Sequence, residues 1–285
     1  EANFRFGAVS GGFSDAATIS LPVYTPASGE AFATYGSVAE DGAVKQVVRR
    51  PGDVWTQFGG LEIMLSSTAM SELTDAFLYL YEYPFECAEQ KSSRILGIAA
   101  MREVLTAFNP TEIPSDAAIK QRMKADTLHL ERMQNSDGGW EYWRKDEDSR
   151  PFVSLHVMHA LARAKKEGYE VNSETISRGL NYLRDIESKC RALKYSEYAT
   201  RSCMAYALYV RNLLGDQDVS EAKTLYKVLA ADKNPNLDAI GWLWPTLTEH
   251  AKGSTELSEL KRLVTNRATQ TADKAQFSTS FGESD

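Results

Sequence analysis

The sequence has few cysteines, few histidines and no long hydrophobic run, and each shortage excludes a class of protein. Three cysteines among 285 residues are too few for a disulfide scaffold or for a zinc site made of cysteine clusters. No apolar run reaches the roughly 18 residues that a membrane-spanning helix needs. Four histidines, together with the lack of a Gly-x-Ser-x-Gly motif, leave a serine hydrolase triad unsupported.

Clusters of basic residues are also missing. The formal net charge is −7, and lysines and arginines occur only in short runs such as Arg49-Arg50 and Lys165-Lys166. We therefore expect no binding to nucleic acid or to anionic lipid. The composition, 43% hydrophobic and 25% charged, is instead typical of a globular protein with one large domain or two smaller ones.

The first part of the chain, residues 1–65, shows the alternation typical of β-strands. Ile19 and Leu21 alternate with polar residues, as expected for a strand with one buried face. Asp41-Gly42 is a strong hairpin-turn sequence, and the valines of residues 44–48 predict a strand after it. Residues 1–65 are therefore predicted to form a small antiparallel β segment.

From about residue 66 the hydrophobic period changes to 3.6, which predicts helices. The first ends near Pro84, the second begins near Glu89 and is closed by Asn109-Pro110, and Ser115 caps the third. Further helices are predicted over residues 152–167, 173–188, 197–214, 219–231, 236–251 and 255–270. Three of these helices are expected to end at a glycine, namely Gly168, Gly215 and Gly253. About nine helices with short loops predict a mostly α-helical solenoid or closed α/α ring.

The most informative stretch is Tyr83-Pro84-Phe85-Glu86-Cys87-Ala88-Glu89-Gln90. Cys87 lies between the end of one predicted helix and the start of the next, where free backbone N–H groups and the helix dipole stabilise a thiolate. Gln90 follows by three residues, a spacing that brings side chains together in a turn that enters a helix. A thiolate held against the glutamine carboxamide carbon can expel ammonia and form a thioester, which is an acyl group stored in activated form.

Neighbouring residues have chemistry that suits such a bond. A thioester hydrolyses when water reaches it, and Tyr83 and Phe85 could help to keep the site dry. Glu89 could carry protons when the thioester forms or is attacked. The simpler interpretation is a buried, inert cysteine beside a helix cap, since single cysteines are usually core residues.

At these residues, and at the following Ser93-Arg94, the sequence resembles the thioester-containing alpha-2-macroglobulin and complement family, and most of all its bacterial alpha-2-macroglobulins. By this resemblance, residues 66–285 look like the thioester domain, an α/α toroid that is cut short at its C-terminus. Residues 1–65 look like part of the CUB-like domain that precedes it.

The resemblance also implies roles for single residues. Cys87 and Gln90 match the two thioester partners, and Glu89 matches the residue between them. Glu86 stands where the family usually has glycine. Complement-type members that prefer hydroxyl targets carry a histidine opposite the thioester, whereas the matching region here offers Tyr195 or Tyr198. The resemblance therefore implies direct attack by lysine amines.

The function that the resemblance implies is a protease trap and not an enzyme. In the family, a protease cleaves a bait region elsewhere in the protein, the thioester becomes exposed, and a lysine amine of the protease attacks it. The expected partners are target proteases and the other domains of the same full-length chain, with no cofactor and no metal. Bacterial members are exported to the periplasm or cell envelope, often with a lipid anchor.

Three further features allow more than one interpretation. The residues from Gln134 to Trp140 have the Gln-x-x-x-Gly-x-Trp form of the terpene-cyclase repeat, but the cyclase acid motif is missing, so we favour a structural turn. His156 and His159 share one predicted helix without a third metal ligand, and we expect ordinary histidines. Cys190 and Cys203 flank a loop between two predicted helices, and they could form a disulfide or stay as buried thiols.

Two other functions remain as alternatives to the trap. An α/α-toroid enzyme, such as a cyclase or a carbohydrate-processing barrel, would need paired acids that converge at the centre of the ring. A non-covalent scaffold would leave Cys87 as a free thiol.

Overall fold

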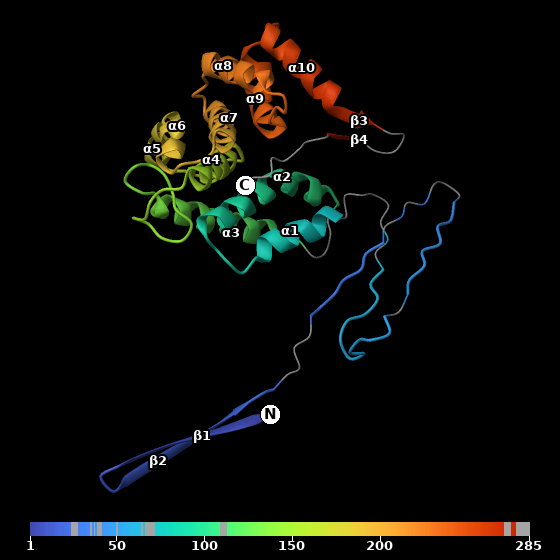
Figure 1. The fold of residues 1–285 in the computed structure, drawn as a ribbon, viewed down its shortest axis with the longest axis vertical. Coiled ribbons are helices and arrows are strands. Elements are labelled where there is room, and N and C mark those ends of the chain that lie inside the picture. Colours follow the sequence, from blue (N-terminus) through green and yellow to red (C-terminus); the bar gives the residue numbers. More distant parts are fainter. Residues whose placement is uncertain are drawn as a thin grey trace. The chain divides into compact units, whose positions relative to one another are not determined.

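The computed structural model describes residues 1–23, 28–34, 36, 38, 42–49, 51–63, 65, 72–108, 113–270 and 275–277. The chain divides into two compact units, Glu1–Met64 and Leu65–Asp285. Figure 1 shows strands in the first unit and helices through most of the second. The predicted fold class, mostly α-helical with a small antiparallel β segment before the helices, is confirmed.

The first unit begins with a β-hairpin made of β1 (Ala2–Ser10) and β2 (Phe13–Leu21). The strands pair antiparallel along their whole length, from Ala2↔Leu21 to Ser10↔Phe13. The turn between them is Gly11-Gly12, and both glycines have positive φ, 56° and 86°, as two-residue hairpin turns require. The alternation at Ile19 and Leu21 therefore predicted a real strand.

The strand predicted over residues 44–48 is wrong, because these residues form no ladder in the structure. Gly36 lies against the side chains of Val44 and Gln46, so two extended segments pass close to each other. Valine favours a strand only where a neighbouring backbone completes the hydrogen bonds. Asp41, the first residue of the predicted turn, lies outside the described residues.

The second unit contains ten helices among the described residues, and their caps explain most of their bounds. They are α1 (Glu72–Glu82), α2 (Ala88–Phe108), α3 (Asp116–Met133), α4 (Pro151–Lys166), α5 (Ser173–Arg184), α6 (Ile186–Ala192), α7 (Glu197–Leu213), α8 (Val219–Ala231), α9 (Leu237–His250) and α10 (Thr255–Arg267). Ser115 accepts a hydrogen bond from the Ala118 N–H as the N-cap of α3. The predicted stops at Gly168, Gly215 and Gly253 all have positive φ, the conformation that ends helices at glycine.

The helix bounds differ from the sequence prediction at two places. The single helix expected over residues 173–188 is two helices, α5 and α6, separated at Asp185. The last predicted helix stops at Arg267, and β3 (Ala268–Gln270) then pairs antiparallel with β4 (Ala275–Phe277). The expected stop at Asn109-Pro110 lies outside the described residues.

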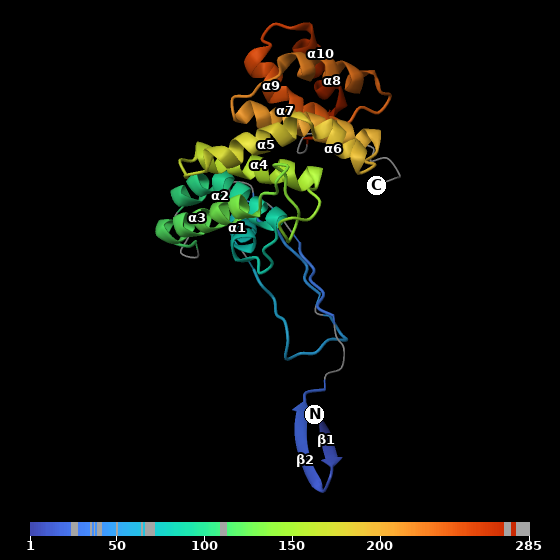
Figure 2. The same ribbon diagram turned by 90° about the vertical axis from the view of Figure 1, so that its left-hand side faces the viewer.

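Helices α2, α4, α7 and α9 form a continuous row in which each packs against the next. The remaining helices flank this row: α1 and α3 pack on α2, α5 and α6 on α4 and α7, and α8 and α10 on α9. Figure 2 shows the helices rising in order from α1–α3 to α8–α10. This alternation of row and flanking helices is the arrangement of an α/α toroid. None of the described helices has the length and apolar character that a membrane crossing requires.

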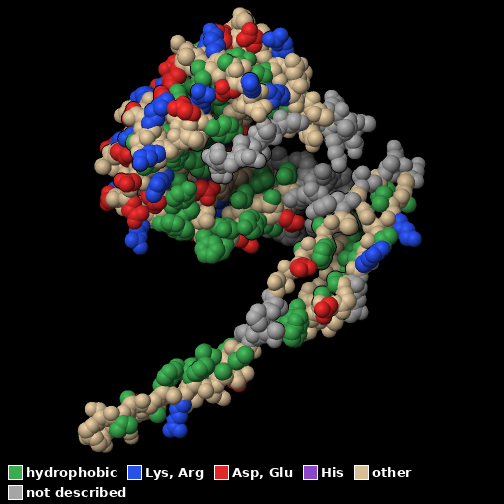
Figure 3. Space-filling view, in the orientation of Figure 1, with side chains coloured by type: hydrophobic (Ala, Val, Ile, Leu, Met, Phe, Trp, Pro, Cys, Tyr) green, Lys and Arg blue, Asp and Glu red, His purple; other side chains and the backbone are tan. Residues whose placement is uncertain are grey.

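Two hydrophobic clusters fill the space between the helices. The first lies between α1 and α7 and includes the fully buried Met123, Trp140 and Leu161. The second lies between α7 and α10 and includes Leu225 and Leu243. Met204 and Trp242 pack against both clusters and join them. Lysines, arginines and acidic residues are interspersed over the face of the helical unit seen in Figure 3, as the scattered charges of the sequence predict.

The loop that resembles a cyclase repeat connects helix ends, as expected for a structural turn. Gln134 Nε2 donates hydrogen bonds to the carbonyl oxygens of Gly138 (3.0 Å) and Thr175 (3.0 Å). Trp140 is fully buried, and its Nε1 donates to the Leu130 carbonyl at 2.7 Å. The loop therefore fastens the end of α3 to the start of α5.

Gly138 in this loop cannot carry a side chain. Its φ is +89°, and a Cβ would clash with the backbone carbonyl of Arg178. We expect Gly138→Ala to lower the free energy of unfolding by about 3 kcal/mol, through backbone strain and the clash together. Gly168→Ala is the matched control, because φ is +83° there with nothing within 4 Å; its cost should be about 1 kcal/mol. Equal losses in chemical denaturation would contradict the proposed clash.

Candidate functional site

The site begins where α2 begins. Helix α1 ends at Glu82, residues 83–87 form a short connection, and α2 starts at Ala88. The Ala88 N–H donates to the Tyr142 carbonyl at 2.7 Å, and the Lys91 N–H donates to the Cys87 carbonyl at 3.0 Å. Cys87 is therefore held at the entry to the helix, and only 4% of its surface is exposed.

The structure brings Gln90 back onto Cys87. The Gln90 Oε1 atom accepts a hydrogen bond from the Cys87 backbone N–H at 3.0 Å. The carboxamide thus lies within the same turn as the cysteine, as the spacing of three residues predicted. Because this hydrogen bond polarises the carboxamide carbonyl, it also favours attack at the carboxamide carbon.

Glu86 anchors the residue before the cysteine through three cations. Its carboxylate accepts hydrogen bonds from Lys91 Nζ (2.8 Å), Arg94 Nη2 (3.1 Å) and Arg122 Nη2 (2.7 Å). The hydrogen bond from Lys91 is the main cause that lowers the pKa of Glu86 from 4.5 to about 2. Glu86 also avoids the left-handed backbone region, which among the described non-glycine residues only Asp146 and Lys194 adopt. The connection therefore does not need the glycine that the family usually has.

A buried aspartate of α3 completes this charge cluster. Asp126 accepts hydrogen bonds from Arg94 Nε at 2.7 Å and Arg94 Nη2 at 3.1 Å, and from Lys91 Nζ at 3.3 Å. The side chains of Arg94 and Asp126 are each only 2% exposed. The cluster thus fixes α2 to α3 directly beneath Cys87. Sequence reasoning missed it, because Asp126 is one of several charged residues on α3 and nothing local marks it as buried.

The predicted aromatic shield is only partly formed by the described residues. Tyr83 and Phe85 pack edge to face with ring centroids 5.7 Å apart. Phe85 is nevertheless 59% exposed, as is Trp143 at 60% in the loop next to Tyr142. Cys87 itself is nevertheless only 4% exposed.

The two tyrosines predicted to face the thioester lie at the start of α7. Tyr198 is 42% exposed. Tyr195 packs against the first hydrophobic cluster, and burial raises its pKa, with smaller contributions from nearby groups that include Tyr142. Tyr195 is thus close to the loop that binds the Ala88 N–H. The facing role of either tyrosine stays a prediction.

A second polar group surrounds Glu89 on the other side of α2. Ser93 donates a hydrogen bond to Glu89 Oε1 at 2.7 Å and lies 2.9 Å from His156 Nε2. His156 Nδ1 is 3.4 Å from the Tyr206 hydroxyl, which is 2.8 Å from His159 Nδ1. Both histidines, expected from the sequence to be ordinary, therefore belong to one chain of hydrogen bonds that ends at Glu89.

Cys190 and Cys203 are both buried free thiols in this structure. They lie together, since a hydrogen bond from Cys203 and burial raise the pKa of Cys190, while the same contact lowers the pKa of Cys203. In this structure the two cysteines are therefore buried thiols, which is one of the two arrangements that the sequence allowed. The disulfide stays a prediction for an oxidising compartment.

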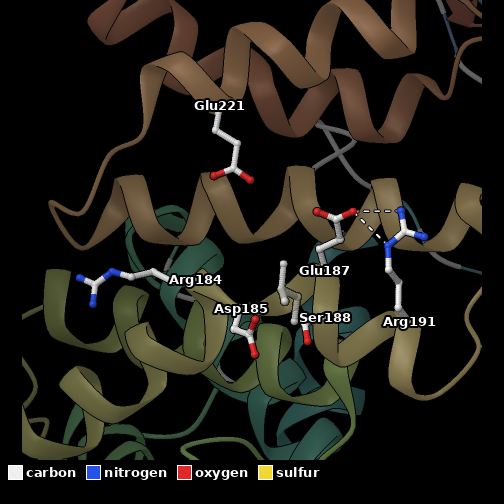
Figure 4. A pocket seen from close by; sticks show the side chains of 7 residues that line it. Arg184, Asp185, Glu187, Ser188, Arg191 and Glu221 are labelled. Atoms are coloured by element: carbon white, nitrogen blue, oxygen red, sulfur yellow. Dashed lines mark hydrogen bonds and ion pairs between the residues drawn. The ribbon is translucent and has the colours of Figure 1, made fainter.

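An open hollow of about 370 Å³ lies where α5, α6 and α8 meet (Figure 4). Asp185, Glu187 and Glu221 line it. Two of these acids are paired with arginine: Glu187 with Arg191 at 2.9 Å and Glu221 with Arg211 at 3.5 Å. The acids lie on flanking helices and not on the row α2, α4, α7 and α9, so they are not the convergent pair that a toroid enzyme would need. Within the described residues, no group of three His, Cys, Asp or Glu side chains could hold a metal ion.

Comparisons with known proteins find similar segments in bacterial alpha-2-macroglobulins and in one protein of a different name. No family model matches the chain. An alpha-2-macroglobulin of Thermotoga maritima is 31% identical over 211 residues, which are 74% of this chain and 12% of that protein. A Dictyostelium discoideum protein named circularly permutated Ras protein 2 is 25% identical over 259 residues, which are 86% of this chain and 7% of that protein.

Solved structures share the fold. The native E. coli alpha-2-macroglobulin superposes with a TM-score of 0.55 at 21% identity, over 67% of this chain and 12% of that one. A crystal structure of a Salmonella alpha-2-macroglobulin mutant gives the same TM-score of 0.55 over 70% of this chain and 13% of that one. The chain therefore spans about a tenth of the length of the relatives that it matches.

Removal of one member of the buried charge cluster should be strongly destabilising, because it leaves the others as buried, uncompensated charges. Asp126→Asn would leave Arg94 and Lys91 in a buried site with Glu86 as their main counter-charge, and we expect a loss of about 3 kcal/mol in the free energy of unfolding. Asp116→Asn on the same helix is the control, because Asp116 is 54% exposed in its pair with Lys120 and should cost about 0.5 kcal/mol. Chemical denaturation of both variants measures the difference, and equal costs would argue against the cluster.

The ion pairs of Glu86 should give a defined pH dependence. A carboxyl group whose pKa is lowered on folding stabilises the protein above its unfolded pKa, and the effect is lost as pH falls through the folded pKa. The stability difference between the native chain and Glu86→Gln should therefore be constant above about pH 5 and shrink between pH 4.5 and about 2. We expect about 1 kcal/mol at neutral pH, since solvent screens a carboxylate that is 39% exposed. Thermal melting across this range tests the prediction, and a difference that grows on acidification would contradict it.

Proposed function

Since the chain is a relative of the bacterial alpha-2-macroglobulins and matches a segment of these longer proteins, we propose that it carries the covalent capture site of a protease trap. The site is an internal thioester between Cys87 and Gln90. The whole protein inhibits endopeptidases by tethering them through this bond. It traps its target and does not turn over substrate.

The observation that carries the proposal is the hydrogen bond of 3.0 Å from the Cys87 N–H to Gln90 Oε1, beside a thiol that is 4% exposed. Attack of the thiolate on the carboxamide carbon forms the C–S bond and expels ammonia, with the thiol proton transferred to the leaving nitrogen. The helix N-terminus favours the thiolate, and the low exposure limits hydrolysis of the product. The charge cluster at Glu86 keeps the two partners in one turn.

Capture is the reverse exchange with a new amine. A lysine amine of the protease attacks the Gln90 acyl carbon, the C–N bond forms, and Cys87 leaves as the thiolate and takes up the amine proton. Relatives with this fold support the choice of partner, since the E. coli alpha-2-macroglobulin has been solved as trypsin-activated and as activated by porcine elastase. The Salmonella protein has been solved after reaction with methylamine, a small amine that can stand in for lysine.

The proposal extends to where the protein works. A trap meets foreign or stray proteases outside the cytoplasm, and we place the full-length protein in the periplasm or cell envelope, lipid-anchored through a part outside this segment. The enzyme alternative is less well supported, because the acids of the hollow at α6 and α8 are paired with arginines. The scaffold alternative predicts a free Cys87 thiol, and this is directly measurable.

Intact mass tests the thioester. The unreacted full-length protein should be lighter by one ammonia than its sequence requires. Methylamine should then add once and release one titratable thiol. Cys87→Ala should abolish all three effects, whereas Cys190→Ala, the same change at another buried cysteine, should keep them. A full sequence mass with a thiol that is already titratable at Cys87 would support the scaffold instead.

Covalent capture has a separate readout. Trypsin added to the full-length protein should give a band of higher mass that survives denaturation, and pretreatment with methylamine should prevent it. A protein that has the thioester but forms no such band would refute capture while it leaves the bond itself intact.

A further inference from the structure

A continuous chain of hydrogen bonds crosses three helices of the central row and ends beside the proposed thioester. It starts at His159 on α4, passes through Tyr206 on α7, His156 on α4 and Ser93 on α2, and ends at Glu89 Oε1. Tyr206 is 6% exposed and the His156 side chain 15% exposed, whereas the Glu89 side chain is 34% exposed. The chain therefore runs from the interior to the surface next to Gln90.

The direction of these hydrogen bonds follows from the number of hydrogens. Ser93 has one hydroxyl hydrogen and donates it to Glu89, so it must accept from His156 Nε2–H. In a neutral imidazole the Nδ1 atom of His156 is then an acceptor for the Tyr206 hydroxyl. Tyr206 in turn accepts from His159 Nδ1–H. Every donor thus points toward the Glu89 carboxylate.

The surroundings of both histidines favour the neutral form that this arrangement needs. Burial lowers the pKa of His156, against the opposing effect of Glu89, whose Oε1 lies 3.7 Å from His156 Nε2. Burial lowers the pKa of His159 to about 4, with smaller contributions from His156 and Arg163. Phe152 stacks on the His156 ring at 5.9 Å between centroids, which fixes the orientation of the ring.

We propose that His156, acting through Ser93, positions Glu89 as the proton carrier for the attack of amines on the thioester. The inference rests on the proposed function and assigns a role inside it. His156 is a positioning residue, because it touches Ser93 and not the reacting atoms.

The reaction requires one proton transfer, which the proposal assigns to Glu89, the residue before Gln90. Aminolysis forms a bond between the amine nitrogen and the Gln90 carbonyl carbon and breaks the bond to the Cys87 sulfur. One proton moves from the nitrogen to the sulfur, and no oxidant or reductant takes part. A carboxylate oxygen can take that proton only where it reaches the amine nitrogen, and the hydrogen bond from Ser93 fixes the position of Glu89 Oε1.

The experiment measures how fast methylamine reacts with the full-length protein, by intact mass over time. We expect His156→Leu, which removes the donor to Ser93, to slow the reaction about tenfold, a modest part of what a positioned acid–base group contributes. His156→Gln keeps an N–H donor and should restore most of the rate. His250→Leu on α9, where His250 bonds to Asn212, is the matched control and should react like the native protein.

Ser93→Ala tests the same link without changing the histidine. It should slow the reaction as much as His156→Leu, and the double variant should be no slower than either single variant. This variant also keeps the test valid where His156→Leu does not fold.

The outcomes separate this inference from the proposed function. Loss of the ammonia-deficient mass in the native protein would overturn both. A native protein and variants that all form the thioester and all react at one rate would overturn the role of His156 alone. A rate that falls equally in His156→Leu and His156→Gln would also overturn it, because the effect would then come from packing and not from the donor.

Discussion

The site depends on where α2 starts. Pro84 prevents α1 from continuing, and the Tyr142 carbonyl receives the N–H of Ala88, the first residue of α2. Cys87 is therefore the last residue before regular helix, and Gln90 is in the first turn. At this junction the backbone turns into the helix, so Gln90 comes close to Cys87, and both residues lie at the helix N-terminus. The other features of the site hold this junction in place.

The charge cluster of Glu86, Lys91, Arg94, Arg122 and Asp126 stabilises this junction from the side of α3. A carboxylate before the cysteine adds a negative charge beside the buried side chains of Lys91 and Arg94. Here Glu86 is matched by Lys91, Arg94 and Arg122, and Asp126 balances the same cations from α3. Replacing such a network by apolar residues could be neutral for stability, whereas removal of one member leaves a buried charge. The network therefore fixes position more than it adds stability, and position is what bond formation between two side chains requires.

The parts of the structure that local chemistry decides could be predicted from the sequence. Ser115 marks the start of α3, Gly168 and Gly215 follow helix ends, and the spacing of Cys87 and Gln90 predicted their proximity, because each depends on residues within one turn. The contacts that depend on tertiary packing could not be predicted in this way.

Arg94 and Asp126 are 32 residues apart, and Ser93 and His156 are 63 apart, so neither pairing is visible until the helices are placed side by side. The strand predicted over residues 44–48 is absent for the same reason, since a β-strand depends on a neighbouring strand that the local sequence does not identify. The sequence therefore predicted that Cys87 and Gln90 lie together, but not the groups that surround them.

The two supporting networks lie on opposite sides of α2, and helix geometry explains why. Glu89 and Ser93 are four residues apart and share one face, whereas Lys91, two residues after Glu89, is rotated by about 200° from it. The first face meets α4 and carries a chain of neutral donors, and the second meets α3 and carries full charges. This separation keeps the lysine and arginine cations of the cluster away from the hydrogen-bonded chain at Glu89. In the proposed trap, one helix therefore holds the turn of Cys87 and Gln90 through its charged side and orients Glu89 through the other.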